Sequence, residues 1–169
     1  MTLPDFDGRG VLPPTEHGEP HLADSSEVEQ RFVVDRDSQE WRIRLMRGWH
    51  ETSQAIWEDC PGAYWWLWGT FVTQHLEPRF GDRETLTCAV FLPDDDLSAL
   101  SLPRRNQLIW YIQDAERRLG VDVSWVLDLP PDDEDYLEQR MAAEKYRDRA
   151  RRSPIEDDEM PVGFVEVRR

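Results

Sequence analysis

The sequence predicts an α+β fold in which a mixed β-sheet is flanked by helices. Apolar runs of strand length recur along the chain, at residues 63–68, 86–92, 121–127 and 162–167. Between them, apolar residues recur every three or four positions over residues 37–57 and 103–119, as expected for helices with one buried face. We therefore expect the four runs to form one sheet, with the run at residues 162–167 at its edge.

Each run has a feature typical of strands. Residues 63–68 read AYWWLW, which is too short for a helix and too apolar for a loop. Residues 86–92 end at a proline. In the third run, Val121, Val123, Trp125 and Leu127 should point to one side of the sheet, and Asp122 and Ser124 to the other.

The helices carry start and stop signals. Residues 26–29 form a capping box that predicts a short helix, and Asp94 to Asp96 favour the positive end of another. Gly120 follows the stripe of 103–119 and suits the position after a helix. A charged helix should run from residue 132 to about 151. In the helix at 37–57, we place Arg42 and Arg44 outside the buried stripe of Trp41, Leu45, Trp49 and Ile56.

The chain of 169 residues is long enough for one domain with a buried core. Residues 1–24 are rich in Pro, Gly, Asp and His without apolar periodicity, which predicts an extended N-terminal arm. Residues 25–169 then form a single domain.

The composition argues against several classes of partner. The net charge of −15 is unsuited to a broad phosphate-binding surface, so we do not expect direct nucleic-acid binding. No signal segment or membrane-spanning run is present in the sequence, and Cys60 and Cys88 are too few for a disulfide framework. We expect a cytoplasmic protein with two free thiols and no membrane contact.

The candidate functional residues cluster around the first two apolar runs, with one more on the third. Gly69 and Thr70 end the first apolar run in a tight turn, where backbone N–H groups could cradle phosphate oxygens. Asp82 and Glu84 lie before the second run and could hold Mg²⁺ for attack on phosphorus. Asp122, on the following strand, could return beside them.

This stretch resembles a small, uncharacterised family of bacterial and phage nucleotidyltransferase-like proteins. The segment GTFVT at residues 69–73, followed by His75 and Pro78, resembles the family's Gly-Ser-Phe-Val-Thr…Lys…Pro motif. Residues 3–17 resemble its opening segment, and residues 160–167 its closing strand. The resemblance implies a nucleotidyltransferase-like sheet.

The family's Asp-x-Asp motif, however, is not matched plainly. Aligned by the apolar strand, its two acids become Thr85 and Thr87; aligned by distance from the glycine turn, they become Asp82 and Glu84. The family's lysine becomes His75. These departures favour a degraded site.

Three functions stay open. The favoured one is a catalytically degenerate pseudoenzyme that binds and regulates a partner protein; the resemblance implies a phage or mobile-element protein directed at a host defence or toxin system. No cofactor is expected for it. The second is an active Mg²⁺-dependent nucleotidyltransferase that modifies protein or RNA with a nucleoside triphosphate. The third is an acidic decoy of a nucleic-acid-binding protein. An active enzyme would use as catalytic and metal-binding residues Asp82, Glu84 and Asp122, and as nucleotide-binding residues Gly69, Thr70, Thr73 and His75.

Overall fold

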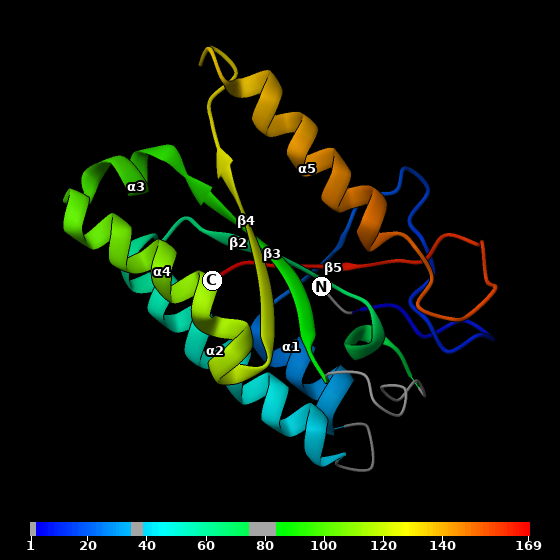
Figure 1. Ribbon diagram of the computed structural model, residues 1–169. Coiled ribbons are helices and arrows are strands. Elements are labelled where there is room, and N and C mark those ends of the chain that lie inside the picture. The colour runs from blue at the N-terminus through cyan, green and yellow to red at the C-terminus, as the bar shows by residue number, and fades with distance from the viewer. Residues whose placement is uncertain (1–2, 35–38, 75–83) are drawn as a thin grey trace.

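The computed structural model describes residues 3–34, 39–74 and 84–169. Its centre is a five-stranded mixed sheet with strand order β1-β5-β2-β3-β4 (Figure 1). The strands are β1 (His21–Ala23), β2 (Tyr64–Trp68), β3 (Leu86–Pro93), β4 (Val121–Asp128) and β5 (Val165–Val167). The predicted α+β class and the mixed sheet flanked by helices are thus confirmed.

The strand pairing differs from the sequence prediction at one side. β2 is antiparallel to both β3 and β5, and β3 is parallel to β4. The predicted position of the last strand at a sheet edge is wrong, because β5 lies between β2 and β1. The N-terminal segment supplies β1, which pairs in parallel with β5 and covers its edge.

The helices lie close to their predicted positions. They are α1 (Ser25–Glu29), α2 (Glu40–Asp59), α3 (Asp94–Ala99), α4 (Leu102–Leu119) and α5 (Tyr136–Ala150), with a π-helical turn η1 (Gln30–Val34) after α1 and a 3₁₀ turn η2 (Thr70–Val72) after β2. Gly120 ends α4 with a φ of 72°, as predicted. The cap of α1 is Asp24 rather than Ser26, since the Glu27 N–H donates to the Asp24 carboxylate at 2.9 Å.

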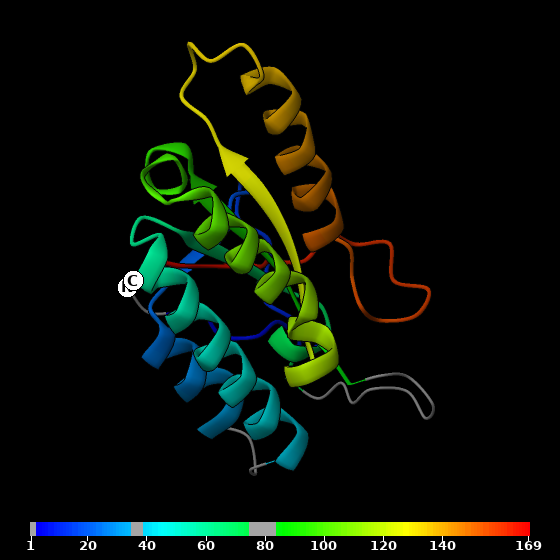
Figure 2. The same ribbon diagram turned by 60° about the vertical axis from the view of Figure 1, so that its left-hand side comes forward.

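Helices cover the two faces of the sheet unequally (Figure 2). One face, here called the three-helix face, packs against α1, α2 and α4 around Trp49, Trp65 and Leu67, all fully buried. The opposite face, here called the α5 face, packs through Trp66 and Trp68 against α5, the one helix on that side in the described part of the chain. Strand residues alternate between the two faces, as a pleated sheet requires.

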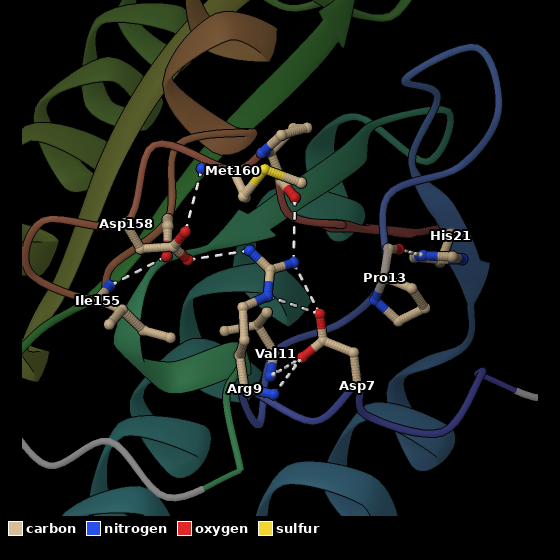
Figure 3. A network of polar contacts seen from close by, with 10 residues as sticks. Asp7, Arg9, Val11, Pro13, His21, Ile155, Asp158 and Met160 are labelled. Atoms are coloured by element: carbon tan, nitrogen blue, oxygen red, sulfur yellow. Dashed lines mark hydrogen bonds and ion pairs between the residues drawn. The ribbon is translucent and has the colours of Figure 1, made fainter.

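The N-terminal segment is held along the domain. Val11 and Leu12 are buried, and the Gly163 N–H donates to the Leu12 carbonyl at 2.7 Å. Figure 3 shows the Arg9 guanidinium between two carboxylates, Asp7 at 2.7 Å and Asp158 at 2.9 Å. Arg9 therefore ties the start of the chain to the acidic loop that precedes β5.

None of the helices in the described part of the chain is long and apolar enough to cross a membrane.

Candidate functional site

The turn after β2 depends on a glycine. Gly69 has a φ of 81° and a ψ of −157°, a combination that is essentially restricted to glycine. A Cβ added to Gly69 would meet no heavy atom within 4 Å, so the requirement comes from the backbone and not from crowding. The chain then enters the single turn of η2.

A buried arginine from α2 holds this turn. Arg42 is 1% exposed, and its guanidinium donates to the carbonyl oxygens of Phe71 at 2.5 Å and Thr73 at 3.1 Å. Longer contacts reach the carbonyls of Thr70 and Phe32, at 3.5 and 3.4 Å. Arg42 therefore satisfies carbonyls that a short helical turn leaves without partners.

The prediction that Arg42 lies outside the buried stripe of its helix is wrong, although the spacing of the apolar residues that follow it indicates burial. Leu45, Met46 and Trp49 follow Arg42 at spacings of three, four and seven, so it lies on their face of the helix. The aromatic ring of Trp41 lies under its guanidinium at 4.5 Å. A long side chain can reach the turn from this position while its stem stays among apolar residues.

Three of the predicted nucleotide-binding residues lie together in this turn: Gly69, Thr70 and Thr73. Thr73 is buried, and its hydroxyl donates to the Thr70 carbonyl at 2.7 Å. The Gln74 N–H donates to the Gly10 carbonyl at 2.6 Å, so the N-terminal segment packs beside the turn. The Thr73 hydroxyl thus uses its proton to stabilise the turn itself. The fourth predicted residue, His75, lies outside the described residues.

The sheet register places a row of three residues beside the turn. Trp68 of β2 is opposite Thr87 of β3, and Thr87 is opposite Asp122 of β4. Residues opposite one another in a sheet share a face. Trp68 packs against Tyr146 of α5, with ring centroids 6.4 Å apart, so the row lies on the α5 face.

Glu84 does not join Asp122 on that face. Its carboxylate makes an ion pair with Arg44 of α2, on the side of the three-helix face. The described residues contain no group of three or more His, Cys, Asp or Glu side chains that could hold a metal ion. The structure therefore does not bring the predicted catalytic residues together. Asp122 lies on the α5 face, whereas Glu84 pairs with Arg44 of α2. Asp82 lies outside the described residues.

The environment of Asp122 disfavours its charged form. Partial burial raises the pKa of the Asp122 carboxyl, Glu116 raises it further, and Arg149 of α5 lowers it in part. Solvent still reaches the side chain. Within the described residues Asp122 therefore has no ion-pair partner, and the residue opposite it on β3 is Thr87.

Glu84 belongs instead to a cavity of mixed charge between α2 and α4. The cavity has a volume of about 520 Å³ and is lined by four arginines and three glutamates, among other residues. Arg44 pairs with Glu84, and Arg118 pairs with Glu51 at 3.6 Å. Because these charges compensate one another, the cavity lacks the excess of cations that a triphosphate would require.

A sequence family described as "Family of unknown function (DUF6932)" matches residues 4–168. The chain belongs to this family. The DUF6932 match extends over all five strands and includes the N-terminal segment that supplies β1. Comparison with curated proteins and with solved structures found no significant match.

Proposed function

We propose that the chain is a nucleotidyltransferase-like protein whose metal site is degenerate and which works by binding and regulating a partner protein. The order strand, glycine turn, strand, helix and strand over β2, β3, α4 and β4 supports the first part. The resemblance to phage and mobile-element proteins supports a partner in a host defence or toxin system.

The observation that carries the proposal is the register of Thr87 with Asp122. In a metal-dependent nucleotidyltransferase, carboxylates on neighbouring strands share Mg²⁺ and neutralise the phosphates of the substrate. Here the position on β3 beside Asp122 is occupied by a threonine. A neutral hydroxyl contributes little to divalent-metal affinity compared with a carboxylate.

Electrostatics points the same way. A nucleoside triphosphate carries about four negative charges, and without bound metal these are repelled by neighbouring carboxylates. Glu84 is already compensated by Arg44, and the chain as a whole carries a net charge of −15. A protein partner with a basic surface would be attracted by the same charge.

The first experiment is a thermal-shift titration with Mg²⁺ and each nucleoside triphosphate. Ligand at about 100 times its Kd would stabilise a competent fold by about 2.7 kcal/mol, which corresponds to a rise in Tm of roughly 5–10 °C. We expect no metal-dependent rise and no transfer of label from a radioactive triphosphate. A rise that disappears in Asp82→Ala or Glu84→Ala would show an active enzyme instead.

A second experiment tests the assignment of the lost acids to Thr85 and Thr87. The double variant Thr85→Asp/Thr87→Asp should gain Mg²⁺ binding by titration calorimetry, since three carboxylates would then converge near the glycine turn. Thr85→Asn/Thr87→Asn is the matched control without added charge. If the aspartate variant is folded and binds no more Mg²⁺ than the control, the nucleotidyltransferase-like arrangement is contradicted.

A third experiment addresses regulation. A function that depends on protein contacts should persist in Asp122→Ala, whereas a catalytic function should be lost. The measurement is the cellular phenotype of the chain compared with that of the variant at equal abundance. Loss of the phenotype in a stably folded Asp122→Ala protein would contradict the non-catalytic proposal.

A further inference from the structure

A second cavity lies on the α5 face, at the opposite end of the strands from Gly69 and Asp122. It has a volume of about 390 Å³ and lies between α5 and strands β2, β3 and β4. Its lining includes the aromatic residues Tyr64, Trp66 and Phe91 of the sheet. This volume falls within the range of small-molecule sites in proteins, about 300–1,000 Å³.

The cavity exists because α5 does not fill it. Leu137 and Met141, the large apolar residues of the first half of α5, are 71% and 64% exposed, so they point away from the sheet. The residues of that half that line the space are polar, namely Tyr136, Gln139 and Arg140. Only Ala150, at the far end of α5, is fully buried.

Two opposite charges line this cavity without an ion pair of their own. The carboxylate of Asp128, the last residue of β4, makes no hydrogen bond or ion pair within the described residues. Arg168 acts on it only at longer range and is itself paired with Glu166 at 2.7 Å. Among the described residues the Arg140 guanidinium makes one hydrogen bond, to the Tyr136 hydroxyl at 3.3 Å, and has no carboxylate partner. A ligand that satisfied both groups would gain two charge-assisted hydrogen bonds.

Further polar atoms around the cavity lack partners. The Nε–H of Arg147 is buried and donates to no acceptor among the described residues, although the terminal nitrogens of Arg147 lie 3.5 Å from Glu19 and 3.4 Å from Glu144. The hydroxyl of Tyr64, which lines the cavity from β2, makes no hydrogen bond to the described residues. Unpaired polar groups of this kind cost stability unless water or a ligand satisfies them.

These features limit the chemistry of the ligand. The carboxylates of Glu19, Asp128 and Glu144 would repel a polyphosphate, and the two arginines would repel a metal ion or a polyamine. Asp128 and Arg140 are exposed to water, and a wholly apolar molecule would displace that water without replacing its hydrogen bonds. A small molecule with one cationic and one anionic end fits both charges. Its apolar part can contact the aromatic rings of Tyr64, Trp66 and Phe91.

We propose that this cavity binds a free α-amino acid with an apolar or aromatic side chain, with its ammonium group at Asp128 and its carboxylate at Arg140. The site is separate from the glycine turn and does not rest on the proposed function.

The test is titration calorimetry of the full chain with L-phenylalanine and L-leucine. Two analogues of phenylalanine, phenethylamine and 3-phenylpropionate, retain only the cationic or only the anionic end. Asp128→Asn should weaken phenylalanine and phenethylamine by about tenfold and leave 3-phenylpropionate unchanged, because only the ammonium contact is lost. Arg140→Gln should weaken phenylalanine and 3-phenylpropionate to a similar degree and leave phenethylamine unchanged.

Two further variants separate binding from stability. Glu138 lies on the exposed side of α5, outside the cavity, so Glu138→Gln should bind phenylalanine as the parent chain does. Ala143→Phe should fill the cavity and abolish binding while the Tm of the ligand-free protein is maintained. Absence of heat with both amino acids, or equal affinity in Asp128→Asn, Arg140→Gln and the parent chain, would overturn the proposal.

Discussion

The two faces of the sheet are built from the same strands but differ in how their aromatic residues are covered. On the three-helix face, indole rings pack against one another in the core: Trp49 contacts Trp57 and Trp65 edge to face, with centroids 6.1 and 6.0 Å apart. On the α5 face, Trp66 and Phe91 also pack closely, at 4.4 Å, but the helix above them leaves a cavity lined by charges.

This difference separates stability from binding capacity. Complete burial of apolar surface is the main source of folding free energy, and the three-helix face provides most of it. A face that keeps polar groups in a cavity contributes less to stability, yet it can exchange water for a ligand. We therefore expect substitutions to have large effects on the first face and small effects on the second.

The largest effect should come from Trp49→Ala. Trp49 is fully buried between two other indoles, so truncation creates a cavity and should lower the free energy of unfolding by about 3–5 kcal/mol. Urea denaturation measures this. Trp110→Ala is the control, because Trp110 is 59% exposed and its loss should change stability within about 0.5 kcal/mol. A cost for Trp49→Ala below about 1 kcal/mol would contradict the description of this face.

The next largest effect should come from Arg42→Met, which removes the arginine that donates to the turn after β2. The carbonyls of Phe71 and Thr73 would lose their donor in a buried environment, at a cost of about 3 kcal/mol. Hydrogen exchange should also become faster at residues 70–73.

Arg44→Met is the matched control on the same helix. The Arg44 side chain is 60% exposed, and its ion pair with Glu84 is screened by solvent, so the loss should be less than about 1 kcal/mol. Equal losses in the two variants would show that Arg42 has no special role in holding the turn.

On the α5 face, Glu166→Gln should have a smaller effect. The Glu166 carboxylate is 6% exposed and accepts hydrogen bonds from the Trp66 indole at 3.0 Å and from Arg168 at 2.7 Å. Glutamine keeps the shape but turns an N–H toward one of these donors, which should cost about 1–2 kcal/mol. Glu138→Gln, on the exposed side of α5, should leave the denaturation midpoint unchanged.

The smallest effect, and one of opposite sign, should come from Asp128→Asn. Partial burial raises the pKa of the Asp128 carboxyl, which Arg168 lowers in part and Glu166 raises. A carboxyl whose folded pKa is raised destabilises the fold above that pKa, and protonation removes the penalty as the pH falls. Asp128→Asn should therefore stabilise the protein at neutral pH by less than about 0.5 kcal/mol, because solvent screens the exposed group.

The pH dependence gives the check. The difference in Tm between Asp128→Asn and the parent chain should disappear in acid, below the unfolded pKa of the carboxyl, where both proteins carry a neutral group. Asp132→Asn, in the loop before α5, is the exposed control. A variant that is less stable than the parent at neutral pH would show that Asp128 has a favourable partner.

The sequence predicted the local elements of this fold because their signals are local. The runs at Tyr64 and Ala89 are apolar over the length of a strand, the run at Val123 alternates, and Gly120 marks the end of α4. The order of the strands depends on pairing between distant segments. β5 lies inside the sheet only because residues 21–23 pair with it, and no pattern within residues 162–167 reports that contact.

The candidate site was predictable in part for the same reason. The glycine turn and Asp122 follow from strand ends and alternation, whereas the direction of Glu84 depends on Arg44, which lies forty residues earlier. The role of Arg42 was missed because a cation was assumed to lie outside an apolar stripe. Its partners are backbone carbonyls, which no side-chain pattern records.

The open edge of β4 has a consequence for solubility. Within the described residues β4 pairs only with β3, so its outer N–H and C=O groups can add another strand. Asp122 and Asp128 stand near its two ends as negative charges that repel a second copy. Because the pKa of each is raised, a falling pH neutralises them before ordinary carboxyls. The folded protein should then assemble edge to edge, and light scattering should rise with concentration at a pH where circular dichroism is unchanged.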